Sequence, residues 1–419
     1  MNVTTAVLCV AVALLAAIQA QFVFGFVRTL RRARLPALTD SQCPKATVIL
    51  CLRGMDPFLE STLRQLLHQD YPRYDVRIVV DSEQDPTWRL VHNVLAEGSP
   101  CPVQVSVLKQ PLATCSLKCS SLVQTVAGLD DSYEAVALLD ADTLPHPTWL
   151  RELVAPLRDP GIGASTGNRW YMPSTPSWGA LVRYEWNSAA AVQMHAFRIA
   201  WGGTLAVKAS ALRQSGALQR WALALSEDTM IYSCLRKLGL QVAFVPTLMM
   251  VNRENCTLRS FVQWVRRQLL VARLYHPGFV PVLLHGFATS LSLAAVLALL
   301  PVAAAVGNGW AAGWLAATLA GYLAAMVALL AVLEYSVRRG LRLRAEPLCR
   351  FDFTRLLRIV VAIPLTQIVY AGVLLSVLRV RRVEWRGAHY EIGGPWNVRL
   401  LEYRPYRAQT LPEQALNSL

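Results

Sequence analysis

Two aspartates separated by a single residue carry the clearest chemical signal in this sequence. Asp140 and Asp142 flank Ala141 at the end of the apolar run AVALLD, and TLPHP follows them. Two carboxylates at a strand end can bind a hard divalent cation, Mg²⁺ or Mn²⁺, together with the diphosphate that the cation carries. The alternative is an Asp-rich turn that merely ends a strand. The apolar run before the pair, and Pro145 and Pro147 after it, favour a metal site.

Three other acidic residues lie where they could act on a substrate. Asp81 ends a second apolar run, VRIVVD, and could accept hydrogen bonds from a nucleoside; a solvated acidic loop is the alternative. Glu227 and Asp228 follow Ser226, which has the residue type of a helix N-cap. The helix dipole alone favours acidic residues in a first turn. The functional interpretation makes one of these two carboxylates a general base in a cleft.

Basic residues in two segments could bind a phosphate. Lys118 opens a predicted helix in the run LKCSS, although an isolated lysine there is usually a surface residue. Gln263, Arg266 and Arg267 belong to FVQWVRRQLLVARLYHP, in which Arg266 is a candidate for diphosphate binding. The same run predicts an amphipathic helix over 259–276 that lies on a lipid surface. The segment can have both properties, because its basic and apolar residues lie on different faces.

The predicted strands bring the acidic residues to one edge of a sheet. Short apolar runs alternate with amphipathic runs from residue 46 onward, as in a parallel sheet with crossover helices. Ligands bind beyond the carboxyl ends of the strands in such sheets, which is where Asp81 and Asp140 lie. We therefore predict a Rossmann-like α/β domain, with strands at 46–52, 76–81, 103–108 and 135–140 and helices at 59–69, 88–95 and 117–127.

The composition indicates that this domain belongs to a membrane protein. Of the 419 residues, 54% are hydrophobic and 16% are charged, against about 45–50% and 25% in soluble domains. The net charge of +14 suits an anionic membrane surface or nucleic acid, and the apolar excess decides for the membrane, so we expect no nucleic-acid partner. The nine cysteines lack metal-ligand and redox spacing and are predicted to be free thiols in a reducing compartment.

An uncharged segment at the N-terminus predicts a membrane anchor. Residues 3–27 are longer than the roughly 20 residues that a spanning helix needs. A cleavable signal peptide is the alternative, but it would begin with basic residues and have a shorter apolar core. The basic run RTLRRAR comes after the segment, so the positive-inside rule predicts that the following domain is cytosolic.

Three further apolar stretches lie in the last third of the chain. The stretches 280–306 and 310–335 are separated only by Gly-Asn-Gly and predict a hairpin. The stretch 356–378 has basic flanks on both sides, which a single crossing cannot satisfy. A re-entrant or surface-lying segment bent at Pro364 is favoured over a failure of the rule. The predicted boundaries are an anchor at 1–27, a cytosolic domain at 28–278, transmembrane or re-entrant helices at 279–378 and a basic, cytosolic, membrane-proximal tail at 379–419.

Taken together, these motifs resemble those of the inverting family-2 glycosyltransferases with the GT-A fold, over roughly residues 44–280. The runs STLRQLLHQDYPRYDVRIVVDSEQDP and PHPTWLRELVAPL look like that family as well. The single N-terminal anchor, LKCSSLVQ and VEWRGAHYEI are similar to its ceramide glucosyltransferase branch. The chain departs from the family at Arg267, where the QxxRW-type motif has Trp, and at Ser120 and Ser121, which replace Asn-type residues. These departures bear on the acceptor more than on the reaction.

The resemblance implies that a hexose, expected to be glucose, moves from a UDP-sugar to a membrane lipid hydroxyl such as that of ceramide or diacylglycerol, with inversion. It implies that Asp81 holds the uridine and that Asp142, helped by Asp140, binds Mn²⁺ or Mg²⁺. It makes Asp228, beside Glu227, the base that takes the acceptor proton. It also implicates Lys118, Gln263, Arg266 and Arg267 near the diphosphate and, more weakly, Gly202, Gly203 and His195 near the acceptor; a plain strand entry and simple packing are the alternatives for these last three.

Two other functions fit part of the pattern. A processive polysaccharide synthase of the cellulose or hyaluronan synthase type shares the carboxylates, but its polymer pore normally needs more spanning helices. A membrane scaffold without turnover would not need the complete set of carboxylates found here. The expected partners are therefore a UDP-sugar donor, a membrane lipid acceptor and the lipid bilayer.

Overall fold

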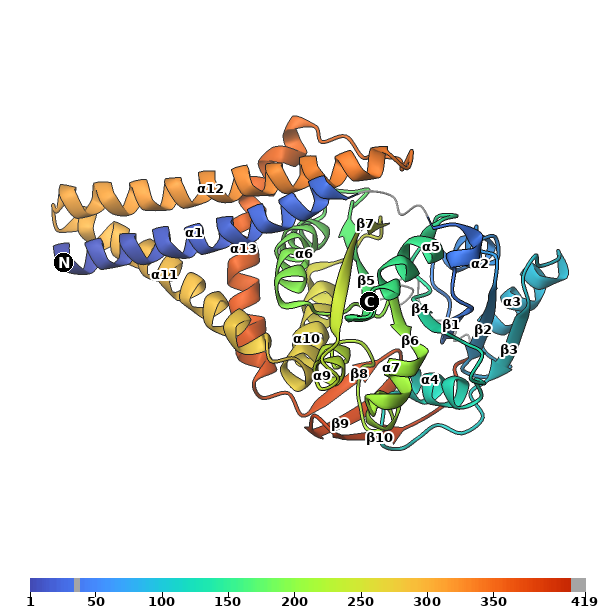
Figure 1. Cartoon of the computed structure of the whole chain (residues 1–419). Coiled ribbons are helices and arrows are strands. Elements are labelled where there is room, and N and C mark those ends of the chain that lie inside the picture. The colour runs from blue at the N-terminus through green and yellow to red at the C-terminus, as the bar shows by residue number, and fades with distance from the viewer. Residues whose placement is uncertain (34–37, 408–419) are drawn as a thin grey trace.

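The computed structural model describes residues 1–33 and 38–407. A seven-stranded sheet in the order β3-β2-β1-β4-β6-β5-β7 lies at its centre, with helices on both faces (Figure 1). Separate apolar cores pack against the two faces of this sheet. The strands are β1 (Ala46–Leu52), β2 (Tyr74–Val80), β3 (Val103–Val107), β4 (Ala135–Leu139), β5 (Ile162–Tyr171), β6 (Thr204–Lys208) and β7 (Gln241–Asn252).

The first four strands run parallel, as their continuous apolar sequences predict. β1 pairs with β2 and β4, and β2 pairs with β3, in registers that align the strand ends. The residues that follow these ends, Arg53, Asp81 and Asp140, therefore meet at one edge of the sheet. β6 runs antiparallel to both β4 and β5, so the whole sheet is mixed and only part of it matches the predicted parallel arrangement.

The connecting helices of this domain are mostly short. α4 begins where the Ser116 side chain accepts a hydrogen bond of 3.2 Å from the N–H of Cys119, and this cap fixes Lys118 in the first turn. The helices are α2 (Leu59–Leu67), α3 (Pro86–Ala96), α4 (Leu117–Ala127), α5 (Trp149–Val154), α6 (Trp178–Phe197), α7 (Ala209–Gln214), α8 (Ala217–Trp221) and α9 (Ile231–Arg236), with 3₁₀ turns at Asp40–Gln42 and Ala155–Arg158.

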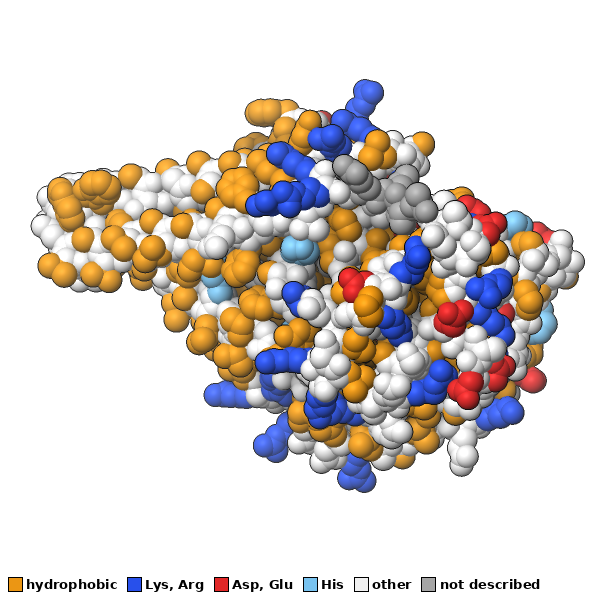
Figure 2. All heavy atoms as spheres, viewed as in Figure 1, with side chains coloured by type: hydrophobic (Ala, Val, Ile, Leu, Met, Phe, Trp, Pro, Cys, Tyr) orange, Lys and Arg blue, Asp and Glu red, His pale blue; other side chains and the backbone are white. Residues whose placement is uncertain are grey.

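Within residues 1–33 and 38–407, four helices are long and apolar enough to span a membrane. Three of them, α1, α11 and α12, extend together away from the sheet (Figure 1), and the tight turn between α11 and α12 contains Gly307 with a φ of 71°. Figure 2 shows only apolar and uncharged side chains on the far half of this bundle, and Lys and Arg side chains where it meets the sheet domain. These helices match the predicted anchor and hairpin. The four are α1 (Asn2–Arg32), α11 (Phe279–Ala305), α12 (Gly309–Arg342) and α13 (Phe353–Val377).

α13 has a different direction from the other three apolar helices. It runs steeply across them in Figure 1 and continues through Pro364 without turning back. The re-entrant form of the prediction is therefore not what the structure has. The surface-lying form stays a prediction, and the length and hydropathy of α13 also allow it to span a membrane.

α10 (Leu258–Tyr275) joins the sheet domain to the membrane helices. Its apolar residues, among them Phe261, Trp264 and Leu270, are buried. The helix packs against α6 and α13. The helix predicted for 259–276 is thus amphipathic, but its apolar face is covered by protein and not by lipid.

The basic segment after α13 is folded. It forms a three-stranded antiparallel sheet that packs against the sheet domain, where the N–H of Leu117 donates a hydrogen bond of 3.2 Å to the Tyr390 hydroxyl. The sequence indicated this tail by its basic charge and by the family resemblance of VEWRGAHYEI, and predicted no sheet in it. Residues 408–419 lie outside the described residues. Its strands are β8 (Arg382–Trp385), β9 (Ala388–Gly394) and β10 (Asn397–Glu402).

Candidate active site

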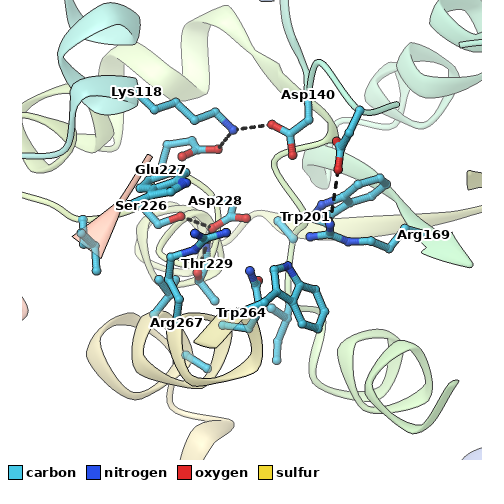
Figure 3. A pocket seen from close by; sticks show the side chains of 18 of the residues that line it. Lys118, Asp140, Arg169, Trp201, Ser226, Glu227, Asp228, Thr229, Trp264 and Arg267 are labelled. Atoms are coloured by element: carbon cyan, nitrogen blue, oxygen red, sulfur yellow. Dashed lines mark hydrogen bonds and ion pairs between the residues drawn. The ribbon is translucent and has the colours of Figure 1, made fainter. Parts of the chain in front are cut away.

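A cavity lies at the edge of the sheet where β1, β2 and β4 end. Its walls come from the loops that follow these strands, from α4, β5 and α6, from the loop at 225–229, from α10 and the start of α11, and from the turn between β8 and β9. Figure 3 shows acidic and basic side chains from these elements pointing toward one another. The residues predicted from the sequence that line it are Asp81, Lys118, Asp140, Asp142, Glu227, Asp228 and Arg267.

Lys118 joins two of the predicted motifs. Its Nζ lies 2.7 Å from Asp140 Oδ1 and 2.7 Å from Glu227 Oε1 (Figure 3). Burial alone would lower the pKa of Lys118, but the two carboxylates raise it well above its usual value. Burial raises the pKa of Glu227 despite the ion pair. Lys118 is therefore a fixed cation in the cavity, and Glu227 is the buried carboxylate that holds it.

Asp142 lies close to another carboxylate, that of Asp140. Burial, followed by the nearby Asp140 carboxylate, raises the pKa of Asp142 to about 6. Burial also acts to raise the pKa of Asp140, but the ion pair with Lys118 outweighs it and lowers that pKa. Arg169 Nη1 stands 3.9 Å from Asp142 Oδ2, and its guanidinium lies 4.9 Å from the Trp201 ring centroid.

The Asp140 and Asp142 carboxylates fit a divalent cation. They are hard oxygen donors in one cavity. A divalent cation between them would reduce the electrostatic repulsion between the two negative charges. No group of three or more His, Cys, Asp or Glu side chains that could hold a metal occurs in 1–33 or 38–407. Two protein carboxylates, completed by substrate phosphates and water, are a donor set that suits Mg²⁺ and similar ions.

Asp228 is held by hydrogen bonds but keeps a free site. Its Oδ1 accepts from the Ser226 hydroxyl at 2.8 Å and from the Thr229 N–H and hydroxyl at 2.6 and 2.9 Å. Its Oδ2 accepts from the N–H of Gly202 at 3.0 Å. Since a carboxylate oxygen has two lone pairs, Oδ2 retains capacity for one more proton donor in the cavity.

The predicted helix start at Ser226 is wrong. α9 begins only at Ile231, and its N-cap position, Met230, makes no side-chain cap. Glu227 and Asp228 lie in the preceding loop, and Ser226 orients Asp228 instead of capping a helix.

Two glycines allow the carboxylates to approach the backbone. A Cβ on Gly202 would lie 2.1 Å from Glu227 Oε1, and a Cβ on Gly203 would lie 2.2 Å from the Trp201 ring and 2.8 Å from Asp140 Oδ2. Any side chain here would displace charged groups of the cavity. The two glycines form a close-packed turn directly before β6, and their placement near the acceptor stays a prediction.

Asp81 is buried at the far end of the cavity, where the C-terminal segment covers it. Its Oδ2 lies 2.6 Å from Arg53 Nη1 and accepts a 2.8 Å hydrogen bond from the Tyr406 N–H. Burial raises the pKa of Asp81. Its Oδ1 has no hydrogen-bond partner within the described parts of the chain. A buried, unpartnered carboxylate oxygen is a natural acceptor for a ligand N–H.

Helix phase separates the residues of the α10 motif. Trp264, Arg267 and Gln268 line the cavity, because positions i, i+3 and i+4 share one helix face. Gln263 and Arg266 are exposed and are not part of the cavity wall, which does not fit their predicted role in donor binding.

The turn between β8 and β9 supplies a further cation. Arg386 donates two hydrogen bonds of 2.7 and 2.9 Å to the Asp56 carboxylate and lines the cavity. The preceding Trp385 ring lies 4.8 Å from the Arg267 guanidinium. Burial and the neighbouring Arg386 lower the pKa of Arg267 to about 10. Excess positive charge of this kind favours an anionic ligand.

His195 lies apart from this cavity. Its Nε2 is 3.1 Å from the Thr29 hydroxyl of α1, and its ring packs against Phe26 and Phe244. Burial lowers the pKa of His195. The packing interpretation given as the alternative therefore describes this residue better than contact with an acceptor.

The cavity also contains residues that the sequence interpretation missed. Arg53 and Asp56 follow the carboxyl end of β1, so the argument that selected Asp81 would have selected them too. Arg169 lies inside β5 and carries no local signal. Arg386 lies in the run VEWRG, whose sequence signals were only a family resemblance and a basic charge.

One family model and several known proteins are similar to this chain. The model of the family described as glycosyl transferase family 21 matches residues 8–395. A ceramide glucosyltransferase from Pyricularia oryzae is 35% identical over 66 residues, a match that spans 15% of this chain and only 13% of the relative.

Two solved structures are also similar. The mannosyltransferase PcManGT from Pyrobaculum calidifontis, solved with GDP-Man and Mn²⁺, is 19% identical and has a TM-score of 0.49 over 89% of this chain and 99% of its own. A glucosyl-3-phosphoglycerate synthase from Mycobacterium tuberculosis, with Mn²⁺ and UDP-Glc, is 16% identical and has a TM-score of 0.37 over 56% and 84% of the two chains. The GT-A type of α/β domain expected from the motifs is confirmed by the family match and the observed sheet. The chain belongs to glycosyl transferase family 21.

Proposed function

We propose that this glycosyltransferase moves a hexose, expected to be glucose, from a UDP-sugar to the hydroxyl of a membrane lipid such as ceramide or diacylglycerol, with inversion at the anomeric carbon. The observation that carries the proposal is that one cavity is lined both by the charged residues of the sheet edge and by Gly278, Phe279 and Val282 at the start of α11. A lipid hydroxyl can reach such a cavity from the bilayer surface without leaving the membrane.

The donor end of the cavity would hold the UDP-sugar. Asp81 Oδ1 is available to accept from the uracil ring, with Arg53 and the Tyr406 backbone fixing the other carboxylate oxygen. Asp140 and Asp142 would bind Mn²⁺ or Mg²⁺, which when present neutralises and orients the diphosphate. Lys118 and Arg386 add fixed positive charge where negative charge develops on the leaving UDP.

Asp228 would act as the base. Its Oδ2 accepts the proton of the acceptor hydroxyl as the hydroxyl oxygen forms a bond to the anomeric carbon and the bond from that carbon to the UDP β-phosphate oxygen breaks. The hydrogen bonds from Gly202, Ser226 and Thr229 fix the direction of this carboxylate. Attack from the face opposite UDP inverts the anomeric centre.

Membranes that contain the full-length protein, incubated with radiolabelled UDP-glucose or UDP-galactose and Mn²⁺, test this function. A discrete labelled lipid on thin-layer chromatography, absent with Asp228→Asn and retained with the exposed control Asp131→Asn, is the expected result. Label in an insoluble polymer would instead identify a polysaccharide synthase. Absence of label in any product with either donor would contradict the proposed donor chemistry.

A further inference from the structure

A second cavity lies where the membrane helices meet the sheet domain. Its walls are formed by α1, α6, α11, α12 and α13. Most of the lining is aliphatic or aromatic, as expected between apolar helices. The polar or titratable members of the lining include Gln19, Glu185, His285, Tyr322, Gln367 and Tyr370.

The Glu185 carboxyl stands out among these groups. It projects from α6, and its Oε1 is buried without a hydrogen-bond partner in 1–33 and 38–407. Burial raises the pKa of Glu185 to about 8, so the group is mostly protonated and uncharged at neutral pH. His285 Nε2 and Thr289 Oγ1, which line the same cavity, are also buried and have no partner among the described residues.

Unpartnered buried polar groups are rare in native proteins because each one costs free energy. Three of them around one cavity indicate a ligand or ordered water that supplies the missing hydrogen bonds. The part of the lining that the structure describes contains no Lys or Arg. An anionic headgroup would therefore find no counter-charge here, whereas an uncharged hydroxyl or amide would find both donors and acceptors.

The second cavity adjoins the candidate active site. Trp186, Ala190 and Gln193 of α6 line both cavities. These shared side chains separate the two cavities, so a ligand in the second cavity lies directly behind the α6 wall of the candidate active site. The hydrocarbon chain of a lipid is apolar, which suits the remainder of the lining.

We propose that this second cavity binds the body of the acceptor lipid, with the Glu185 carboxyl hydrogen-bonded to an uncharged hydroxyl or amide group of that lipid. The inference rests on the proposed function, because the lipid's reactive hydroxyl must extend past Trp186 toward Asp228. It adds a binding site and a specificity rule: neutral lipids with hydrogen-bonding groups fit, and anionic phospholipids do not.

Photocrosslinking of the full-length protein in neutral detergent tests the site without the donor. The probe is an N-acyl amino alcohol that carries a diazirine in its acyl chain, and the crosslinked peptides are identified by mass spectrometry. We expect labelling in α6, α11 and α13, and competition by unlabelled N-acyl amino alcohol but not by phosphatidylserine. Crosslinks confined to other segments, or competition by phosphatidylserine equal to that by the neutral lipid, would overturn the inference.

Two substitutions separate hydrogen bonding from packing. Glu185→Leu should reduce crosslinking about fivefold to tenfold, which corresponds to the loss of one hydrogen bond, and raise the KM for the lipid acceptor by a similar factor. Glu185→Gln, which resembles the protonated carboxyl, should stay within about twofold of the wild type. UDP binding should be unchanged in both variants, which shows that the active site is folded.

The outcomes distinguish the two proposals. Lipid crosslinked in the second cavity of a protein that labels no lipid with either UDP-sugar would contradict the proposed function and leave the binding site standing. Lipid glycosylation with wild-type crosslinking in Glu185→Leu would contradict only the role of Glu185.

Discussion

Lys118 and Glu227 form an ion pair of 2.7 Å that connects the first turn of α4 to the loop carrying Asp228. The same ammonium group binds Asp140, so one lysine fixes the acidic pair at the end of β4 relative to the candidate base. The groups proposed to hold the diphosphate and to take the acceptor proton are therefore part of one electrostatic unit.

Removing this lysine should lower both stability and activity. Lys118→Met leaves two carboxylates without their counter-charge, and we expect a loss on the order of 2–3 kcal/mol in the free energy of unfolding, below the range for fully buried pairs because the Lys118 side chain is 18% exposed. Denaturation of the detergent-solubilised protein measures it. The double variant Lys118→Met/Glu227→Gln should recover part of this loss, because it no longer has an unpaired charge at Glu227. A double variant that is no more stable than Lys118→Met would contradict the energetic coupling between Lys118 and Glu227.

Replacing the candidate base should affect the chemical step and not donor binding. We expect Asp228→Asn to lower kcat by about 10²–10⁴-fold, because Asn cannot accept the proton of the acceptor hydroxyl. The affinity for UDP with Mn²⁺, measured by calorimetry, should remain that of the wild type, as it should in Asp131→Asn. Full turnover in Asp228→Asn would assign the base to another residue.

Chelation should abolish transfer reversibly. If Asp142 holds the divalent ion, EDTA removes activity and added Mn²⁺ restores it, because the diphosphate loses its counter-charge without the metal. Asp142→Asn should raise the Mn²⁺ concentration needed for half-maximal activity by about tenfold or more, equivalent to at least 1.4 kcal/mol. Titrations of activity against Mn²⁺ give both values, and an unchanged Mn²⁺ requirement in Asp142→Asn would remove Asp142 from the metal site.

The C-terminal sheet should contribute to donor binding through Arg386. Arg386→Ala removes a cation from the cavity and takes away the two hydrogen bonds that the Asp56 carboxylate accepts from it. We expect the KM for the UDP-sugar to rise about tenfold, as for the loss of a charge-assisted hydrogen bond. Arg382→Ala, at an exposed position of β8, is the matched control and should leave this KM unchanged. Equal KM values in the two variants would rule out the assignment.

Glu185 should make stability depend on pH. Burial raises the pKa of Glu185 from 4.5 to about 8, so the folded state holds this proton more tightly than the unfolded state. The contribution of Glu185 to the free energy of unfolding is therefore fully present below pH 4.5 and is lost as the pH rises to about 8. In this range the free energy of unfolding falls by up to about 1.4 kcal/mol per pH unit. The other titratable groups lining this cavity are His285, Tyr322 and Tyr370.

Thermal unfolding between pH 5 and 8.5 measures this dependence. The melting temperature of Glu185→Gln should match the wild type near pH 5 and exceed it increasingly toward pH 8.5. The exposed Glu83→Gln serves as the control and should follow the wild type throughout. A constant difference between Glu185→Gln and the wild type would show that Glu185 does not titrate in this range.

Local sequence patterns were sufficient to predict most of the strands and apolar helices, and part of the candidate active site. Apolar runs at 46–52 and 135–140 give strands that are buried on both faces, and uncharged runs of bilayer length give α1, α11 and α12, because each pattern depends on neighbours in the sequence. Since parallel strands end at one edge of the sheet, the sequence alone predicts that Asp81 and Asp140 lie near each other.

The side chains that meet in the cavity come from segments far apart in the sequence, and their meeting depends on how the chain packs. Arg386 pairs with Asp56 across 330 positions of the chain, and no local pattern encodes the contact. Arg267 lines the cavity and the neighbouring Arg266 does not, because the two side chains lie on different faces of α10. The direction of α13 is set by its packing against α6 and α10. Sequence determines which residues can form a strand, a span or a cap, because those depend on short-range geometry, whereas charge pairing and cavity walls depend on how distant segments pack.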